Sequence, residues 1–222
     1  TNGHYIRSDK EAEAIVESGL DEIIVSLDGV EQETYEAYRV GGDIERVFSG
    51  VRRLVEAKQR RGVGVPLINL QFIVMRHNES ELAEAERLAR ELGVDKFLVK
   101  TAQVYSQEDA EQFLPENDAF NRYRETESAL VVKGQPARGC KVLWYSSMVN
   151  WNGEVAPCCF DKDIDYGMGQ AFSGDSFKKI WKGRAYMDFR RQLLKDRNEV
   201  DMCRNCSEGY RGMFSLVKEL RD

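Results

Sequence analysis

The N-terminal part of the chain alternates short apolar runs with longer amphipathic segments. Residues 22–27, 66–75 and 97–99 have the length and composition of buried parallel strands. Residues 43–62 and 78–92 carry apolar positions at helical spacing. The order turn, helix, strand, helix, strand, helix, strand predicts a parallel α/β fold with right-handed crossovers, either an open sheet or a barrel.

Capping residues define where the expected helices begin. Ser8 and Glu11 form a capping box for a first helix, and we expect Asp43 and Asn78 to cap the next two. In parallel α/β folds the ligand lies where the strands end at their carboxyl side. We therefore expect a ligand site near residues 26–29, 75–78 and 100–102.

The second half of the chain changes character. Residues 105–139 are polar and acidic, which indicates a linker with a possible helix at 118–129. We expect a strand at 142–151, a hairpin turn at Asn152-Gly153 and a returning strand at 154–157. The predicted organisation is thus an α/β part at 1–104, the linker at 105–139 and a small subdomain at 140–222. Helices are expected in that subdomain at three places: 176–181, 185–195 and a last stretch with Phe214, Val217 and Leu220.

All the cysteines lie in this subdomain: Cys140, Cys158, Cys159, Cys203 and Cys206. Two intervening residues let Cys203 and Cys206 direct both thiolates at one ion or cluster, and the others can complete a four-thiolate site. Five unrelated buried cysteines are the alternative, which their absence from the first 139 residues disfavours. A subdomain with so small a core would gain much of its folding free energy from such a site.

Composition narrows the class of protein. The 222 residues are 42% hydrophobic and 32% charged, as in ordinary globular domains. A net charge of −6 argues against nucleic acid as the main partner. No apolar run has membrane-spanning length and no signal peptide is visible, so we expect a cytoplasmic protein without membrane contact. Five cysteines fit metal binding in a reducing compartment. Because the chain begins with Thr, we expect upstream sequence.

Four motifs in order carry a family resemblance. They are T-N-G at residues 1–3, V-S-L-D-G at 25–29, Y-R-V-G-G at 38–42 and W-N-G-E-V-A-P-C-C at 151–159. Together with the final C-x-x-C they span nearly the whole chain. In this the chain resembles a radical S-adenosylmethionine enzyme with a C-terminal auxiliary-cluster extension of the SPASM or twitch type.

The departures from the family pattern are equally informative. The C-x-x-x-C-x-x-C of the catalytic cluster and the G-G-E motif are both missing from this sequence. The resemblance therefore implies that this fragment alone does not cleave S-adenosylmethionine. Five cysteines, against about seven in a full SPASM domain, favour a single-cluster, twitch-like extension. Without the preceding strands, the strand at 22–27 has an unpaired edge, which we expect to be disordered, covered by another chain or paired with the missing upstream part.

The resemblance implies a partial (β/α)6 barrel that retains strands four to six, followed by a small β-hairpin plus helix iron–sulfur subdomain. It further implies an auxiliary [4Fe–4S] cluster held by Cys140, Cys158, Cys203 and Cys206. Cys158 is preferred to Cys159 because it ends the hairpin strand. A structural four-cysteine zinc site is the alternative for the same residues.

The resemblance also implies contacts to the S-adenosylmethionine cofactor. The residues expected to make them are Thr1, Asn2, Ser26, Arg39 and Val74. For Ser26 the alternative is a hydroxyl bonded to local backbone, for Arg39 a surface salt bridge to a glutamate, and for Val74 a place in the core. Asn78 is expected to be a helix cap alone.

The resemblance implies that the intact protein is a radical S-adenosylmethionine oxidoreductase or maturase. The missing catalytic cluster, a second [4Fe–4S] group, would generate a 5′-deoxyadenosyl radical that abstracts a substrate hydrogen. The auxiliary cluster would then take the remaining electron from the substrate radical. The implied partners are a small sugar or peptide substrate and an electron donor such as a flavodoxin or ferredoxin. The alternative is an inactive accessory or binding protein with a structural zinc or iron–sulfur site.

Overall fold

The computed structural model describes residues 1–125, 130–134, 139–174, 176–208 and 215–220. They form two compact units, one of residues 1–122 with 215–220 and one of residues 123–208. The break after Arg122 falls inside the stretch expected to be a linker. None of the helices described is long and apolar enough to cross a membrane.

The first unit is built on a four-stranded sheet. Its order is β1 (Glu22–Ser26), β2 (Leu67–Val74), β3 (Lys96–Thr101) and β9 (Ser215–Glu219). The first three strands are parallel, as predicted, and β9 runs antiparallel to β3. Apolar side chains of these strands, including Val25, Leu70 and Phe97, are buried in one core.

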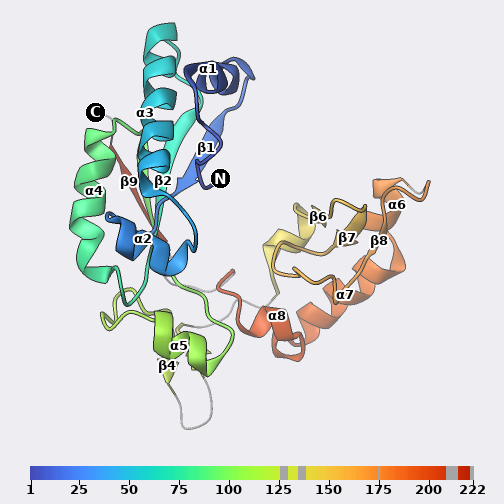
Figure 1. Ribbon diagram of the computed structural model, residues 1–222. Coiled ribbons are helices and arrows are strands. Elements are labelled where there is room, and N and C mark those ends of the chain that lie inside the picture. The colour runs from blue at the N-terminus through green and yellow to red at the C-terminus, as the bar shows by residue number, and fades with distance from the viewer. Residues whose placement is uncertain (126–129, 135–138, 175, 209–214, 221–222) are drawn as a thin grey trace. The chain divides into compact units, whose positions relative to one another are not determined.

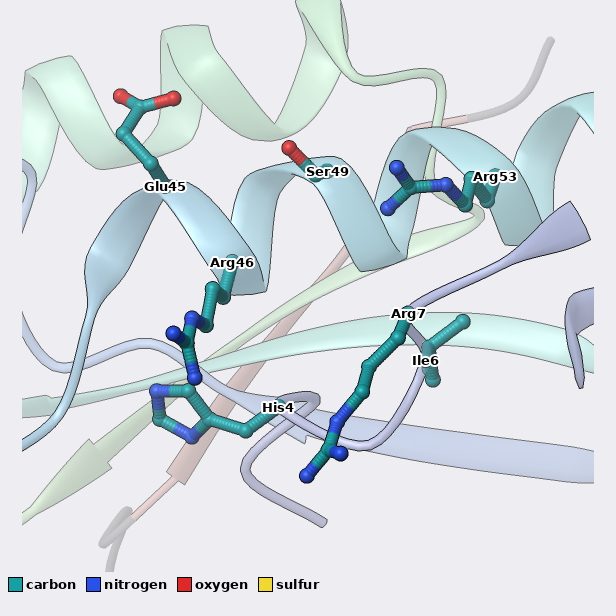
Figure 2. A pocket seen from close by; sticks show the side chains of 7 residues that line it. All are labelled: His4, Ile6, Arg7, Glu45, Arg46, Ser49 and Arg53. Carbon is teal, nitrogen blue, oxygen red and sulfur yellow. The ribbon is translucent and has the colours of Figure 1, made fainter.

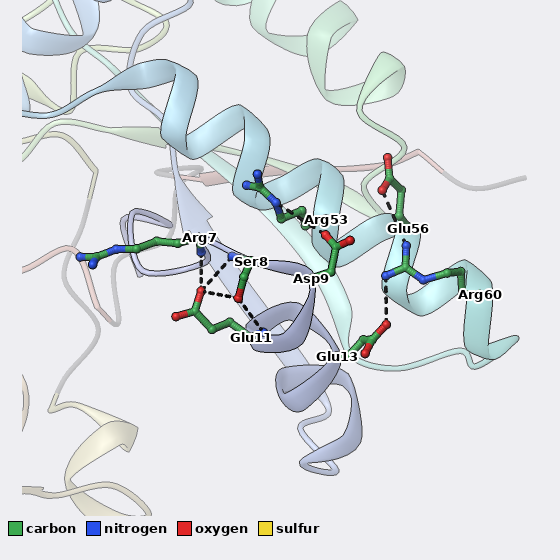
Figure 3. Close-up of polar contacts among 8 residues, drawn as sticks. All are labelled: Arg7, Ser8, Asp9, Glu11, Glu13, Arg53, Glu56 and Arg60. Carbon is green, nitrogen blue, oxygen red and sulfur yellow. Dashed lines mark hydrogen bonds and ion pairs between the residues drawn. The ribbon is translucent and has the colours of Figure 1, made fainter.

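The helices of this unit begin largely where the capping residues predict. The elements are α1 (Asp9–Glu17), α2 (Gln32–Tyr38), α3 (Ile44–Arg61), η1 (Glu79–Glu81), α4 (Leu82–Glu91) and α5 (Gln107–Phe113). Ser8 and Glu11 form the predicted capping box (Figure 3). Asp43 caps α3 by accepting the backbone N–H of Arg46. Figure 1 shows α1, α3 and α4 on one face of the sheet, the arrangement that right-handed crossovers produce.

A buried ion pair joins α3 to the sheet. Lys58 and Asp95 are 3% and 2% exposed, and the Lys58 ammonium lies 2.8 Å from Asp95 Oδ2. Lys58 also donates to the Pro66 carbonyl at 2.7 Å, and Asp95 Oδ2 accepts the Ile68 N–H at 2.6 Å. Two buried charges therefore fix the start of β2 against the end of α3.

The outer edge of β1 is paired at one point. The Thr1 amino group donates to the Ile24 carbonyl at 2.8 Å, and the Ser26 N–H donates to the Thr1 carbonyl at 2.9 Å. Bonds to the residues on either side of Val25 are the pattern of a parallel strand pair. Thr1 therefore continues the sheet beyond β1.

The second unit is made of short elements. Its strands are β4 (Tyr123–Glu125), β5 (Leu130–Val132), β6 (Met148–Val149), β7 (Glu154–Ala156) and β8 (Gly169–Gln170). Its helices are η2 (Lys141–Trp144), α6 (Phe177–Trp181), α7 (Arg184–Lys195), η3 (Arg197–Glu199) and α8 (Asp201–Arg204). The predicted hairpin at Asn152-Gly153 joins β6 to β7, and the helices predicted at 176–181 and 185–195 are present. This unit has its own small core, which includes Tyr186 and Leu193.

Three predicted elements are wrong. The last stretch is the strand β9 and not a helix, because the open edge of β3 offers backbone partners that outweigh the helical spacing of Val217 and Leu220; Phe214 lies outside the described residues. Residues 123–125 of the supposed helix at 118–129 pair with β5, and 126–129 lie outside the described residues. The strand predicted over 142–151 is confined to Met148–Val149, since the chain first turns through η2.

Candidate functional site

The five cysteines of the second unit line one cavity of about 220 Å³. Cys140 lies directly before η2, and Cys158 and Cys159 follow β7 in the turn after the hairpin. Cys203 lies on α8, and Cys206 follows it. The fold thus brings the four predicted ligands together from segments that are up to 66 positions apart (206 − 140) in the sequence.

Burial separates the adjacent cysteines Cys158 and Cys159. Cys158 is buried, as are Cys203 and Cys206, and Cys140 is half-buried. Cys159 is exposed. A thiol that faces solvent is less well placed to enclose a buried ion or cluster, so the geometry supports the choice of Cys158 over Cys159.

The thiols influence one another's ionisation. Burial raises the pKa of Cys203 to about 12 and that of Cys206 to about 11. Burial raises the pKa of Cys158 as well, and the neighbouring Cys140 adds to the increase at all three. Four thiolates so close together need a bound cation to be ionised together.

The donor set therefore fits an iron–sulfur cluster or another thiophilic metal. Among the residues that the structure describes, no three His, Cys, Asp or Glu side chains are arranged to hold a metal ion. The fit consequently depends on the shared cavity and on the all-sulfur chemistry, and not on a preformed coordination geometry.

Two buried side chains shape the backbone around these cysteines. Arg197 donates to the carbonyls of Cys203, Cys206 and Glu208 at 3.0, 2.8 and 2.5 Å, and its charge opposes the rise in the pKa of the Cys203 and Cys206 thiols. Asp161 accepts the N–H groups of the two residues at 165 and 166 at 2.9 and 3.1 Å. Asp161 is buried, and through these two bonds it closes the turn after the cysteine pair.

Asp28 is the centre of the polar network at the ends of β1 and β2. Its carboxylate is fully buried, accepts the Ile73 N–H at 2.7 Å and pairs with Arg39, whose Nε lies 2.8 Å away. Burial raises the pKa of Asp28, against the attraction of Arg39. The V-S-L-D-G and Y-R-V-G-G motifs thus meet through one ion pair. Asp28 lies in the predicted ligand region 26–29 but was not among the predicted contact residues. The next residue is a glycine because the backbone of α2 is close: a Cβ at Gly29 would lie 2.5 Å from the Tyr35 nitrogen.

Asn78 has a different role from the one predicted. It makes no side-chain cap for η1. Its buried amide instead donates to the carbonyls of Asp28 and Ile73 at 3.0 Å each, and its oxygen accepts the Met75 N–H at 2.7 Å. The side chain therefore ties the segment after β1 to the end of β2.

The predicted cofactor contacts lie in different surroundings. Asn2 and Arg39 line one cavity of about 590 Å³, together with Tyr35, whose buried hydroxyl has no hydrogen-bond partner among the described residues. Thr1 is exposed and lies beside the half-buried Ser26. Val74 is fully buried in the core cluster. The alternative proposed for Arg39, a surface pair with a glutamate, is wrong, since its partner is Asp28.

A second cavity adjoins this one at the start of α3. It has a volume of about 480 Å³ and is lined by seven residues, shown in Figure 2: His4, Ile6, Arg7, Glu45, Arg46, Ser49 and Arg53. His4 anchors the N-terminal segment here, with its Nε2 3.0 Å from the Asp43 nitrogen. Arg46 and Arg53 pair with Asp43 and Asp9, the second at 3.6 Å. No motif in the sequence indicated this cavity.

A comparison with protein families finds a match in the second unit. Residues 140–207 match the SPASM family, described as an iron-sulfur cluster-binding domain. This range contains every cysteine of the chain. The unit that brings the cysteines together is therefore similar to an iron–sulfur cluster-binding domain.

Comparisons with individual proteins and solved structures find similarity that extends over both units. The chain is 38% identical over 98 residues to pre-heme d1 synthase of Dinoroseobacter shibae, a match that covers 44% of this chain and 22% of that protein. It is 30% identical over 168 residues to PqqA peptide cyclase of Gluconobacter oxydans, covering 66% of this chain and 44% of that protein. A structure of anSMEcpe with bound AdoMet and a bound peptide matches with a TM-score of 0.55 at 15% identity, over 95% of this chain and 64% of that one.

These matches agree with the resemblance found in the sequence: residues 140–207 match the SPASM family, and the chain is similar to parts of radical S-adenosylmethionine enzymes. The predicted α/β fold, a part of the radical S-adenosylmethionine barrel without closure, is confirmed too. Iron–sulfur clusters and S-adenosylmethionine are the cofactors of this class. The chain spans less than half the length of the curated relatives named above.

Proposed function

We propose that this chain is part of a radical S-adenosylmethionine enzyme that modifies a peptide and carries an auxiliary [4Fe–4S] cluster. Cys140, Cys158, Cys203 and Cys206 are the proposed ligands. The observation that carries the proposal is that these four thiols face one cavity inside the unit that matches an iron–sulfur family.

The auxiliary cluster is proposed to accept one electron from the substrate radical. Hydrogen abstraction by the 5′-deoxyadenosyl radical leaves a substrate radical with one unpaired electron. When this radical loses that electron and a proton, the two-electron oxidation of the substrate is complete. Four thiolate ligands leave no iron open to the substrate, which suits electron transfer. A flavodoxin or ferredoxin is the proposed external electron donor.

A peptide is favoured over a sugar as the substrate. One relative is named for a peptide that it cyclises, and one structural neighbour contains a bound peptide. The sugar remains the second candidate for the substrate class. Incubation of the intact enzyme with each class, with product masses read by mass spectrometry, separates them.

The cofactor contacts stay a proposal. Asn2 and Arg39 line a shared cavity and Thr1 adjoins Ser26, so these four residues lie in the region where the strands end. Arg39 is held by Asp28 and would offer the cofactor carboxylate the nitrogen that Asp28 does not occupy. Val74 is fully buried in the core cluster, which favours its alternative role in the core over the proposed contact.

The test uses the full-length protein, purified without oxygen and reconstituted with iron and sulfide. Iron and sulfide content, visible absorbance and electron paramagnetic resonance are measured for the parent, Cys158→Ser and Cys159→Ser. The proposal expects the auxiliary cluster to be lost in the first variant and retained in the second. A colourless parent with one bound zinc, or no cleavage of S-adenosylmethionine under reducing conditions, would support the alternative of an accessory protein with a structural metal.

A further inference from the structure

Arg197 is a buried arginine beside the proposed ligands. It is 6% exposed, begins η3 and lines the cysteine cavity. A guanidinium is charged at every pH at which proteins fold, and burial of such a charge is costly unless its N–H groups are bonded. Here Nε, Nη1 and Nη2 each donate to a different backbone carbonyl.

Those carbonyls belong to the C-x-x-C turn itself. Nε donates to Cys203 at 3.0 Å and Nη2 to Cys206 at 2.8 Å, so one rigid fork holds the backbone of both proposed ligands. Nη1 reaches Glu208 at 2.5 Å, and the Glu208 N–H donates to the Cys206 sulfur at 3.3 Å. Arg197 therefore fixes the turn from its first cysteine to the residue that bonds the second sulfur.

We propose that Arg197 is a positioning residue for the Cys203–Cys206 pair and that its charge raises the reduction potential of the cluster held there. This inference rests on the proposed function, since it needs a cluster at these cysteines. The positional part follows from geometry: a planar fork satisfies three carbonyls at fixed spacing, which a single ammonium cannot do.

The electrostatic part follows from the sign of the charge. Reduction adds one negative charge to the cluster and its thiolates, and a buried cation beside them stabilises the reduced form in a medium of low dielectric constant. Loss of that cation makes the cluster harder to reduce. A lysine at the same position keeps the charge and loses the fork, so two substitutions separate the two effects.

The experiment compares Arg197→Gln and Arg197→Lys with the parent in the full-length reconstituted protein. The readouts are the midpoint potential of the auxiliary cluster, from a redox titration followed by paramagnetic resonance, and the rate of cluster loss to a chelator. We expect a more negative potential for Arg197→Gln, a potential close to the parent for Arg197→Lys and faster cluster loss for both. If neither variant retains a cluster long enough for titration, that loss supports the positioning role, provided the control below retains its cluster.

Arg190 provides the matched control. It is also a buried arginine that donates to backbone carbonyls, namely those of Leu143 and Trp181, and it lies over the Trp181 and Tyr186 rings. It does not line the cysteine cavity. Arg190→Gln should lower stability without moving the potential of the cluster.

The outcomes distinguish the two proposals. A parent without an iron–sulfur cluster at these cysteines refutes the proposed function itself. A parent with the cluster, together with an Arg197→Gln variant of unchanged potential and unchanged rate of cluster loss, overturns the inference about Arg197 alone. An equal change of potential in Arg190→Gln also overturns it, because the effect would then be general loosening of the unit.

Discussion

Replacing Lys58 by Met tests whether the buried ion pair holds the first unit together. The methionine keeps most of the apolar stem and removes the ammonium. The Asp95 carboxylate would then remain buried without its cation, and the Pro66 carbonyl would lose the donor that now lies 2.7 Å away. The start of β2 would be held by the Ile68 N–H bond to Asp95 and by the sheet.

The expected cost is large because neither group can reach water. Removing one member of a buried pair typically costs about 3–5 kcal/mol. Lys58 and Asp95, with side chains 3% and 2% exposed, form such a buried pair. Since domains are commonly stable by about 5–15 kcal/mol, Lys58→Met should remove about a fifth or more of the free energy of unfolding.

The assay is urea unfolding followed by circular dichroism, on the parent, Lys58→Met, Asp95→Asn and the double variant. The double variant buries no charge, so it should cost less than the two single costs added, by roughly 1–3 kcal/mol. The control is the exposed pair of Arg60 with Glu13, drawn in Figure 3, at 45% and 46% exposure. Arg60→Met should change stability by less than about 1 kcal/mol.

Two results would refute this reasoning. One is a cost for Lys58→Met no larger than that for Arg60→Met. The other is strict additivity in the Lys58 and Asp95 cycle, which would mean that the charges do not interact.

The remaining predictions concern the network at the strand ends and the first helix. Because burial raises the pKa of Asp28, its favourable contribution is complete below its unfolded value of about 3.8 and is lost as pH rises through the folded value. Asp28→Asn should therefore gain stability relative to the parent as pH rises above about 3.8, measured by urea unfolding over a series of pH values; a constant difference would contradict this. Asn78→Ala leaves three backbone groups without their side-chain partner and should cost about 2–4 kcal/mol, unlike a helix cap, whose loss costs about 1. Ser8→Ala removes the bond to the Glu11 N–H and should cost about 1 kcal/mol by thermal melting, while Ser18→Ala at the other end of α1 serves as its control.

Local patterns were enough to predict the parallel part of the fold. The strands at 22–26 and 67–74 are predictable because each is an apolar run bounded by turns. The start of the first helix is predictable because the capping box of Ser8 and Glu11 lies within four consecutive residues. These features depend on neighbours in the sequence. They are present in the structure because the local preference of these residues agrees with the position that each takes in the fold.

The predictions were wrong where contacts with residues far away in the sequence determine the local structure. Residues 215–219 form a strand because they pair with the edge of β3, which lies more than a hundred positions earlier in the sequence. Asn78 looks like a cap, yet its amide bonds backbone at the end of β1. Of the candidate site, the cysteines were visible from their clustering, whereas Asp28 and Arg197 were not, since their partners are fixed only by the fold.

The position of β9 makes the first unit discontinuous. The chain leaves this unit after Arg122 and contributes β9 to it again at Ser215. A truncated protein that stops at the end of the family match, at residue 207, would lack β9 and leave the backbone of β3 open over Lys96–Lys100. Unpaired edges of this kind recruit strands from other molecules. Expression trials of the α/β unit should therefore retain residues 215–219, joined by a linker if the cluster domain is removed, because without them self-association is the expected failure.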